Sequence, residues 1–319
     1  MTVWVTIDDV ERAAKVLDGV TVRTPVLRND ELDVRTGASV FLKAECLQRG
    51  GAFKLRGAFN KISSIPEADR RDGIVAVSSG NHAIAVALSA NLLGTHATIL
   101  VPADAPAAKI DVVRALGAEI VTYDRFAEDR DTVTRAFVTE RGVPFVSPYD
   151  DPAIIAGQGT VALELFDQVG DLDVLVVPVS GGGLIAGCGI VAAARSAATR
   201  MIGVEPASMD DTRRSLAAGE RVAVPISTTI ADGLTVSTPG ELTWPINQRH
   251  LAQVVTVTDD QLVMAMRFLF DSVHLVTEPS GVAGVAALLS GAVEAPGERV
   301  GVVVSGGNVG LTRFLELVR

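Results

Sequence analysis

The sequence has little of what marks a secreted, metal-cluster or nucleic-acid-binding protein. Its 319 residues include only two cysteines, Cys46 and Cys188, and neither has a C-x-x-C partner or a nearby histidine pair. We therefore expect free thiols in a reducing, cytoplasmic compartment and neither a disulfide framework nor a zinc site. The formal net charge of −10 includes no long run of one sign, which argues against nucleic acid as a partner.

Targeting and membrane signals are also missing. Segment 1–9 has no cationic start and no long apolar core, so it does not resemble a signal peptide. The uncharged window 174–194 is long enough to span a bilayer, but Pro178 and the turn Ser180-Gly181-Gly182-Gly183 interrupt it. A buried strand, a turn and a buried helix explain this window better, and no membrane partner is expected.

Short apolar runs alternate with helix-like segments at about thirty residues or less per unit, the spacing of βαβ crossovers. The runs lack polar alternation, as expected of parallel strands covered on both faces. The predicted strands are 39–44, 73–77, 97–101, 119–122, 144–146, 173–179, 201–204, 254–257 and 300–304. The predicted helices are 8–17, 57–65, 83–93, 109–116, 132–140, 184–195, 260–270 and 281–289. We predict an α/β fold of two parallel-sheet αβα lobes with a cleft between them.

One lysine is placed where it could carry covalent chemistry. Lys54, in Ala52-Phe53-Lys54-Leu55-Arg56-Gly57, lies between a strand-like run and a helix-like run. A partly desolvated lysine beside the cationic Arg56 is expected to have a lowered pKa and could attack a carbonyl group. Most single lysines are merely solvated, so this interpretation depends on the turns that follow.

Three turns at predicted strand ends are rich in small polar residues, and strand ends are where open α/β sheets bind ligands. Ser180-Gly181-Gly182-Gly183 precedes a helix, so its backbone N–H groups and the helix terminus could hold a phosphate. Ser78-Ser79-Gly80-Asn81-His82 could hold a carboxylate or a ring hydroxyl, or could equally be a helix cap. Ser305-Gly306-Gly307-Asn308 presents a neutral hydroxyl, with a structural turn as the alternative.

A phosphate cradle, a lysine amine and a neutral hydroxyl on one cleft together indicate pyridoxal 5'-phosphate. The cofactor aldehyde needs Lys54, its phosphate needs the glycine turn, and Ser305 would face its ring nitrogen. A neutral partner leaves that nitrogen largely unprotonated, so we expect prompt loss of a β-leaving group. The alternatives are a non-catalytic binding protein and a dinucleotide-binding protein. For the latter, Gly181, Gly183 and Ala186 approximate the fingerprint, and Glu205 ends the next strand.

With these motifs assembled in order, the chain resembles the fold-type II pyridoxal-phosphate enzymes, a group with the tryptophan synthase β fold. Within that group it is similar to the serine/threonine dehydratase and serine racemase family. The resemblance extends over nearly the whole chain. Its motifs are Thr24-Pro25-Val26, 41–45, 52–58, 78–82, Ala156-Gly157-Gln158-Gly159-Thr160, 180–184, Ala231-Asp232-Gly233-Leu234, Glu278-Pro279-Ser280-Gly281 and 305–308.

The resemblance implies a role for each motif residue. Lys54 binds the cofactor covalently and then acts as base at the substrate α-carbon, and Ser79 faces it from the other side, as in the racemases. The implied cofactor-binding residues are Phe53, Lys54, Asn81, Ser180, Gly181, Gly182, Gly183, Leu184, Glu278 and Ser305. The implied substrate-binding residues are Ser78, Ser79, Asn81 and His82. Residues 1–71 and 150–319 would form a large cofactor-binding domain and residues 72–149 a small substrate-binding domain.

The resemblance also implies a reaction, a metal and an assembly. We expect deamination of L-threonine or L-serine to a 2-oxo acid and ammonia, with serine racemisation or 3-hydroxyaspartate dehydration as the alternative, in a homodimer. Arg130 aligns with an arginine of some racemases that could recognise an acidic substrate, and Tyr149 is expected to border the pocket. Glu205, Met209 and Asp211 match the family's divalent-cation site, suited to Mg²⁺ or Ca²⁺, although solvated loop acids are the alternative.

The chain departs from the commoner family pattern at two positions. Ala52 replaces a serine, and Ser180 begins a turn where the racemases have a fourth glycine, which favours a dehydratase. The sequence ends at Arg319, soon after the catalytic motifs, so we do not expect a regulatory domain that responds to isoleucine.

Overall fold

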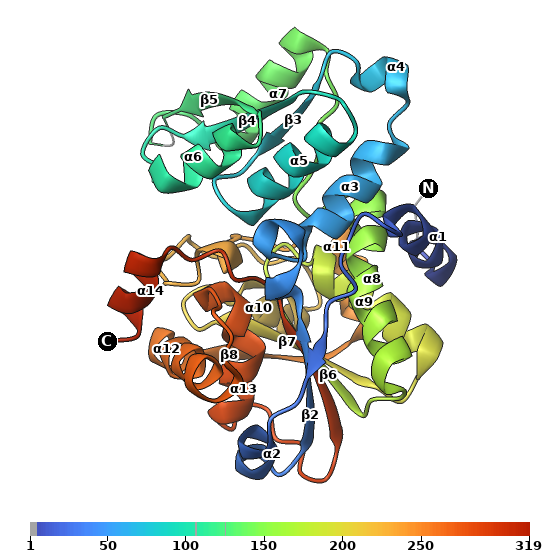
Figure 1. The fold of residues 1–319 in the computed structure, drawn as a ribbon, viewed down its shortest axis with the longest axis vertical. Helices are drawn as coiled ribbons and strands as arrows, with labels where there is room; N and C mark the ends of the chain where they lie inside the picture. The colour runs from blue at the N-terminus through green and yellow to red at the C-terminus, as the bar shows by residue number, and fades with distance from the viewer. Residues whose placement is uncertain (1–4, 106, 125) are drawn as a thin grey trace.

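The computed structural model, which describes residues 5–105, 107–124 and 126–319, contains two sheets (Figure 1). The first four residues of segment 1–9 lie outside this described part. The large sheet has the order β1-β2-β9-β6-β7-β8, and the small sheet has the order β3-β4-β5. The strands are β1 Val26–Leu27, β2 Ser39–Ala44, β3 Ile74–Val77, β4 Ala97–Pro102, β5 Glu119–Tyr123, β6 Val174–Pro178, β7 Arg200–Pro206, β8 Leu251–Val257 and β9 Arg299–Val304. All neighbours are parallel except β1 and β2, so the predicted α/β fold with parallel sheets is confirmed.

One predicted strand is wrong. Segment 144–146 makes only an isolated parallel bridge, between Phe145 and Val75. Pro144 has no N–H group to donate, which limits the pairing that this segment can continue.

Helices connect the strands and cover both faces of the large sheet. They are α1 Ile7–Leu17, α2 Asp30–Thr36, α3 Lys54–Ser64, α4 Glu67–Arg70, α5 Asn81–Leu92, α6 Ala107–Ala115, α7 Arg130–Arg141, α8 Pro152–Val169, α9 Gly183–Arg195, α10 Asp211–Ala218, α11 Thr243–His250, α12 Asp259–Phe268, α13 Ala283–Leu289 and α14 Leu311–Leu317. One apolar cluster joins the large sheet to α2, α12, α13 and α14, and a second joins it to α1, α8, α9 and α11. Each cluster removes one face of the sheet from water, which explains the continuous apolar runs of its strands.

The window 174–194 contains β6, a turn and most of α9, as predicted. Within the described residues, no helix has both the length and the apolar character needed to cross a membrane.

Helix α3 connects the two lobes, which are the large sheet with its helices and the small sheet with its helices. Ala58 and Ile62 belong to the apolar core of the small lobe, although they precede residue 72. Helix α3 also crosses α8 at very short distance, because a Cβ at Gly157 would lie 2.6 Å from the Arg56 carbonyl oxygen. The proposed boundaries at residues 72 and 149 therefore stay a prediction. The close crossing fixes the start of α3, where Lys54 lies.

Candidate active site

Lys54 is the first residue of α3, and its amine is held inside the protein. Its Nζ donates a hydrogen bond to the Pro148 carbonyl oxygen at 2.6 Å and lies 5.2 Å from the centre of the Phe53 ring. Burial lowers the pKa of Lys54 from 10.5 to about 8. The lowered pKa was predicted, but the predicted contribution of Arg56 is wrong, because burial is the cause and the charge of Arg56 is balanced elsewhere.

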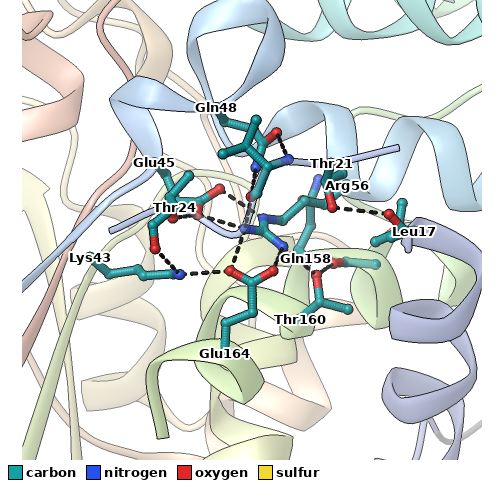
Figure 2. Close-up of polar contacts among 12 residues, drawn as sticks. Leu17, Thr21, Thr24, Lys43, Glu45, Gln48, Arg56, Gln158, Thr160 and Glu164 are labelled. Carbon is teal, nitrogen blue, oxygen red and sulfur yellow. Dashed lines mark hydrogen bonds and ion pairs between the residues drawn. The ribbon is translucent and has the colours of Figure 1, made fainter. Parts of the chain in front are cut away.

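Arg56 belongs to a buried ionic cluster, which Figure 2 shows. Its Nε and Nη2 donate to the two carboxylate oxygens of Glu45 at 2.8 Å each, and its Nη1 and Nη2 donate to Glu164 at 2.7 and 2.9 Å. Thr160 and the Val22 carbonyl accept further hydrogen bonds. These two carboxylates raise the pKa of Arg56 against the effect of burial. The guanidinium, fully buried, therefore has its donors directed to fixed acceptors.

Lys43 completes the cluster and neutralises it. Its Nζ donates to Glu164 at 2.6 Å and to the Thr24 carbonyl at 2.9 Å. Two cations and two carboxylates leave no net charge, so the cluster places little field on Lys54. It joins β2 and the 3₁₀ turn after it to α3 and α8, and thus anchors the helix that carries Lys54.

The predicted phosphate cradle forms the turn between β6 and α9. The carbonyls of Gly181 and Gly182 are held by α11, accepting from Thr243 Oγ at 2.6 Å and from Asn247 Nδ2 at 3.4 Å. In the described part of the chain, no acceptor takes a hydrogen bond from the amides of residues 181–184. Free amides at the start of a helix are suited to an anion.

Tyr149 lies directly against this turn. A Cβ at Gly181 would lie 2.3 Å from its ring, and a Cβ at Gly183 would lie 2.9 Å from its carbonyl oxygen. The phenol interacts electrostatically with the Arg130 side chain, and burial raises the pKa of Tyr149. The glycines thus also make room for Tyr149, a reason that the motif alone does not reveal.

The loop before α8 is held against the start of α11, the helix that also holds the glycine turn. Both carboxylate oxygens of Asp150 accept backbone hydrogen bonds from the start of α11, at Glu241, Leu242 and Thr243. Because α11 also holds the glycine turn, one helix sets the position of Tyr149 relative to the cradle.

The segment 78–82 closes β3 and opens α5. Ser78 Oγ accepts from the Gly80 amide at 3.1 Å, which is a turn contact, and Ser79 is half-buried at the helix start. His82 is buried, and its Nε2 lies 2.9 Å from the Val146 carbonyl oxygen, to which it must donate. Burial, and then the charge of Lys54, lower the pKa of His82 to about 3. Its neutral ring has no remaining N–H group, so its predicted contact with a substrate carboxylate is left to its backbone amide.

Ser305 and Glu278 lie with Lys54 at the carboxyl end of the large sheet. The Phe53 amide donates to the Ser305 carbonyl at 3.1 Å, and Ala52 bridges Gly306. Among the described residues, the Ser305 hydroxyl has no hydrogen-bond partner. Glu278 accepts from Asn81 Nδ2 at 2.5 Å, which links the small lobe to the large one.

Asn308 was named in the motif without a role, and the structure brings it into the site. Its Nδ2 donates to Asn81 Oδ1 at 2.7 Å and to the Gly50 carbonyl at 2.7 Å. The sequence signal for it is the asparagine that ends Ser305-Gly306-Gly307-Asn308. Its partner could not be predicted because it lies 227 residues away in the chain.

Glu205, in β7, and Asp211, the first residue of α10, lie near each other in the large lobe. Glu205 accepts the backbone amides of Thr212 and Arg213 at 2.9 and 3.0 Å, and burial raises its pKa to about 7. Asp211 Oδ2 is buried without a partner among the described residues, and burial and the Glu205 charge raise its pKa to about 8. Met209 is fully buried. The described residues contain no group of three or more His, Cys, Asp or Glu that could hold a metal.

The same contacts remove the acid on which the dinucleotide alternative depended. Glu205 is fully buried and turned to α10, so it does not face the glycine turn as a ribose ligand would.

Cys46 and Cys188 are free thiols, as predicted, and both are buried. Burial raises the pKa of each thiol to about 12, so neither is a reactive thiolate at neutral pH.

Pyridoxal phosphate fits this donor set. A lysine amine of lowered pKa, unpaired helix-start amides and an unpaired neutral hydroxyl provide partners for its aldehyde, its phosphate and its ring nitrogen. The asparagine side chain of Asn81 adds an N–H group for the ring hydroxyl. The aldehyde, phosphate, ring nitrogen and ring hydroxyl of the cofactor would thus each have a protein group of suitable chemistry.

Comparisons with known proteins agree with this fit. A family model described as "Pyridoxal-phosphate dependent enzyme" matches residues 17–306. L-threo-3-hydroxyaspartate ammonia-lyase of a Pseudomonas species is 44% identical over 311 residues, which cover 98% of each chain. The protein of that name from Saccharomyces cerevisiae is 43% identical over 296 residues, 93% of this chain and 91% of its own. The structure of maize serine racemase matches with a TM-score of 0.94 at 38% identity, covering 98% of this chain and 97% of that one. The chain therefore belongs to the fold-type II pyridoxal-phosphate dependent enzymes, with dehydratases and racemases among its relatives.

Proposed function

We propose that this enzyme is an ammonia-lyase that converts 3-hydroxyaspartate to oxaloacetate and ammonia. The sequence alone favoured L-threonine or L-serine as substrate and gave serine racemisation or 3-hydroxyaspartate dehydration as the alternative. Two relatives above 40% identity carry the name L-threo-3-hydroxyaspartate ammonia-lyase, so 3-hydroxyaspartate has the better support.

The structural observation that supports an acidic substrate is the Arg130–Tyr149 pair beside the glycine turn. Arg130 forms an exposed ion pair with Asp131 at 3.0 Å, and its side chain remains 48% exposed. Its guanidinium also reaches Tyr149, whose ring lies on Gly181. A half-exposed guanidinium at this place can bind a second carboxylate, which 3-hydroxyaspartate has and serine and threonine lack.

The cofactor would be held by the residues that the sequence predicted, from Lys54 and the glycine turn to Ser305. When bound, it withdraws electrons from the substrate α-carbon and so makes the α-proton acidic. Lys54, whose lowered pKa keeps part of its amine neutral at pH 7–8, is the proposed base that removes that proton. Ser79, on the opposite side, is the proposed second proton-handling group that would act in racemisation.

The proposed reaction balances without an added oxidant. The Cα–H bond breaks at Lys54, the Cβ–OH bond breaks, and water leaves. The released enamine then takes up water, loses ammonia and becomes oxaloacetate. The backbone amides at the start of α5, with Ser78 and Ser79, are the proposed partners of the α-carboxylate.

A divalent cation, a homodimer and a cytoplasmic location are further parts of the proposal. Asp211 Oδ2, which lacks a hydrogen-bond donor among the described residues, lies beside Glu205 and supports Mg²⁺ or Ca²⁺, because such a cation would stabilise both buried carboxylates in their charged form. The two buried free thiols suit a reducing compartment.

A substrate panel tests the function. The threo and erythro forms of L- and D-3-hydroxyaspartate, with L-serine, D-serine and L-threonine, would be assayed for 2-oxo acid, for ammonia and for chirality of the recovered substrate. We expect the highest kcat/KM with one 3-hydroxyaspartate isomer. A higher value with threonine or serine would contradict the acidic substrate, and recovered serine of inverted chirality would indicate a racemase.

The cofactor is tested separately by colour. The purified protein is expected to absorb at roughly 410–430 nm, with loss of the band after borohydride treatment and in Lys54→Ala. A colourless protein after soaking with pyridoxal phosphate would contradict the cofactor site.

A further inference from the structure

Three side chains form a directed hydrogen-bond chain between the lobes. Asn308, after β9, donates through Nδ2 to the Gly50 carbonyl and to Asn81 Oδ1, both at 2.7 Å. Asn81, the first residue of α5, then donates through its own Nδ2 to Glu278 Oε1 at 2.5 Å. Both ends of the chain are acceptors.

The polarity of this chain has only one solution. The Gly50 carbonyl can only accept, so Asn308 must turn its NH₂ group toward it. The second hydrogen of that NH₂ group faces Asn81, which must then present its carbonyl oxygen. The NH₂ group of Asn81 is thereby directed at Glu278, whose carboxylate accepts. With either amide reversed, two oxygens would face each other.

The backbone is shaped to hold Asn308 in this place. Gly51 has φ of +74°, and a Cβ there would lie 2.1 Å from Asn308 Oδ1. The Gly307 amide donates to the Gly51 carbonyl at 2.8 Å, which fixes the two turns against each other. A side chain at position 51 would displace Asn308, so the glycine serves this contact.

We propose that Asn308 is a positioning residue that sets the orientation of the Asn81 amide and leaves its second N–H group free for the ring hydroxyl of the cofactor. The inference rests on the proposed cofactor contact of Asn81 and not on the substrate. Asn81 Nδ2 has two hydrogens, and Glu278 takes one of them. In the reversed orientation, Asn81 would present an oxygen to the ring hydroxyl and to Glu278.

Isosteric substitution separates orientation from space filling. Asn308→Asp keeps the shape but can only accept, so Asn81 must turn its NH₂ group to position 308 and its oxygen to Glu278. Asn308→Ala removes the partner and leaves Glu278 to orient Asn81. We expect the cofactor dissociation constant to rise about tenfold or more in Asn308→Asp and only about threefold in Asn308→Ala.

Two further readouts do not depend on turnover. The absorption maximum of the bound cofactor should shift in Asn308→Asp, because the ring hydroxyl loses a donor. The melting temperature of each variant without cofactor shows whether it folds. Asn29→Asp is the matched control, because Asn29 also donates to a carbonyl, that of Ser272 at 2.9 Å, and an aspartate there can still cap α2. It should bind the cofactor as the parent does.

The outcomes are separable. If the parent does not bind pyridoxal phosphate, the proposed function fails. If the parent binds it and Asn308→Asp has the same dissociation constant and absorption maximum, the inference is overturned. A larger loss in Asn308→Ala than in Asn308→Asp also overturns it, because that order indicates space filling. Should Asn308→Asp not fold, Asn308→Ala decides, and unchanged cofactor binding there overturns the inference.

Discussion

Arg56 and Glu45 form a two-point ion pair, with Nε and Nη2 each 2.8 Å from a carboxylate oxygen and both side chains fully buried. Arg56 follows Lys54 by two residues at the beginning of the same helix, and Glu45 lies in the 3₁₀ turn after β2. The pair stabilises the helix start and leaves the pKa of Lys54 to be set by burial.

Replacing Arg56 by methionine should destabilise the protein by about 3–5 kcal/mol, because Glu45 would be left buried without a counter-ion. Urea unfolding of the cofactor-free protein measures this loss. The charge-balanced double variant Arg56→Met/Glu45→Gln, which keeps the Lys43–Glu164 pair, should recover most of it. A double variant as unstable as the single one would show that the ion pair is not the stabilising element.

The pH dependence of cofactor uptake should follow the amine of Lys54. With a pKa of about 8, about a quarter of the amine is neutral at pH 7.5, against roughly a thousandth for an unperturbed lysine. The rate of colour formation after mixing with pyridoxal phosphate should therefore rise with pH through a midpoint near 8. A midpoint near 10 would show that burial does not lower this pKa.

The same shift has a stability consequence with a definite sign. The folded state releases the Lys54 proton near pH 8, whereas the unfolded chain releases it near 10.5. The unfolded state thus binds more protons in this window, and the cofactor-free protein should gain stability as pH rises from 8 toward 10.5. Comparison with Lys54→Met, which lacks the amine, isolates this contribution in urea titrations at several pH values.

Arg130→Met should lower kcat/KM for 3-hydroxyaspartate about 10–100-fold, since a charge-assisted hydrogen bond to the second carboxylate is lost. Activity with L-serine, which has no second carboxylate, should change little. Arg135→Met is the control, because Arg135 lies on the same helix and donates a hydrogen bond to the exposed Thr132. An equal loss of kcat/KM for both substrates would show that Arg130 does not bind the second carboxylate.

Mg²⁺ or Ca²⁺ should raise the melting temperature of the parent, because a cation would bind the carboxylates of Glu205 and Asp211 in the folded state only. Asp211→Asn should abolish the rise. Glu220→Gln should preserve it, because Glu220 is an exposed acid just after α10, the helix that begins with Asp211. A rise that persists in Asp211→Asn would place the cation elsewhere.

Much of the fold could be predicted because buried parallel strands have a simple signature. The continuous apolar runs 174–178 and 300–304 indicated buried strands. The glycine turn after the first run indicated the start of a helix. Helix α8 was not predicted. Most of its residues are buried on all sides and two glycines lie inside it, so it shows neither an apolar stripe nor a favourable composition.

Only the parts of the site that lie within a single sequence motif could be predicted. The sequence predicted roles for Lys54, the glycine turn and Ser305, but it assigned Arg56 a charge effect on Lys54 that Glu45 and Glu164 cancel. It also could not show that the Val146 carbonyl occupies the ring N–H group of His82, which leaves the predicted substrate contact to the backbone amide. In each case the hydrogen-bond partner is distant in the chain, so a local sequence motif cannot predict the contact.

The pairing of β2 with β9 has a consequence for how the enzyme is made. Strand β2 leaves the ribosome early, but its neighbour on one side, β9, is synthesised roughly 250 residues later. One edge of this apolar strand therefore stays unpaired in the nascent chain until β9, within the last tenth of the sequence, has been made. Chaperone dependence during translation, and early degradation of fragments that stop before residue 299, follow from this order of synthesis.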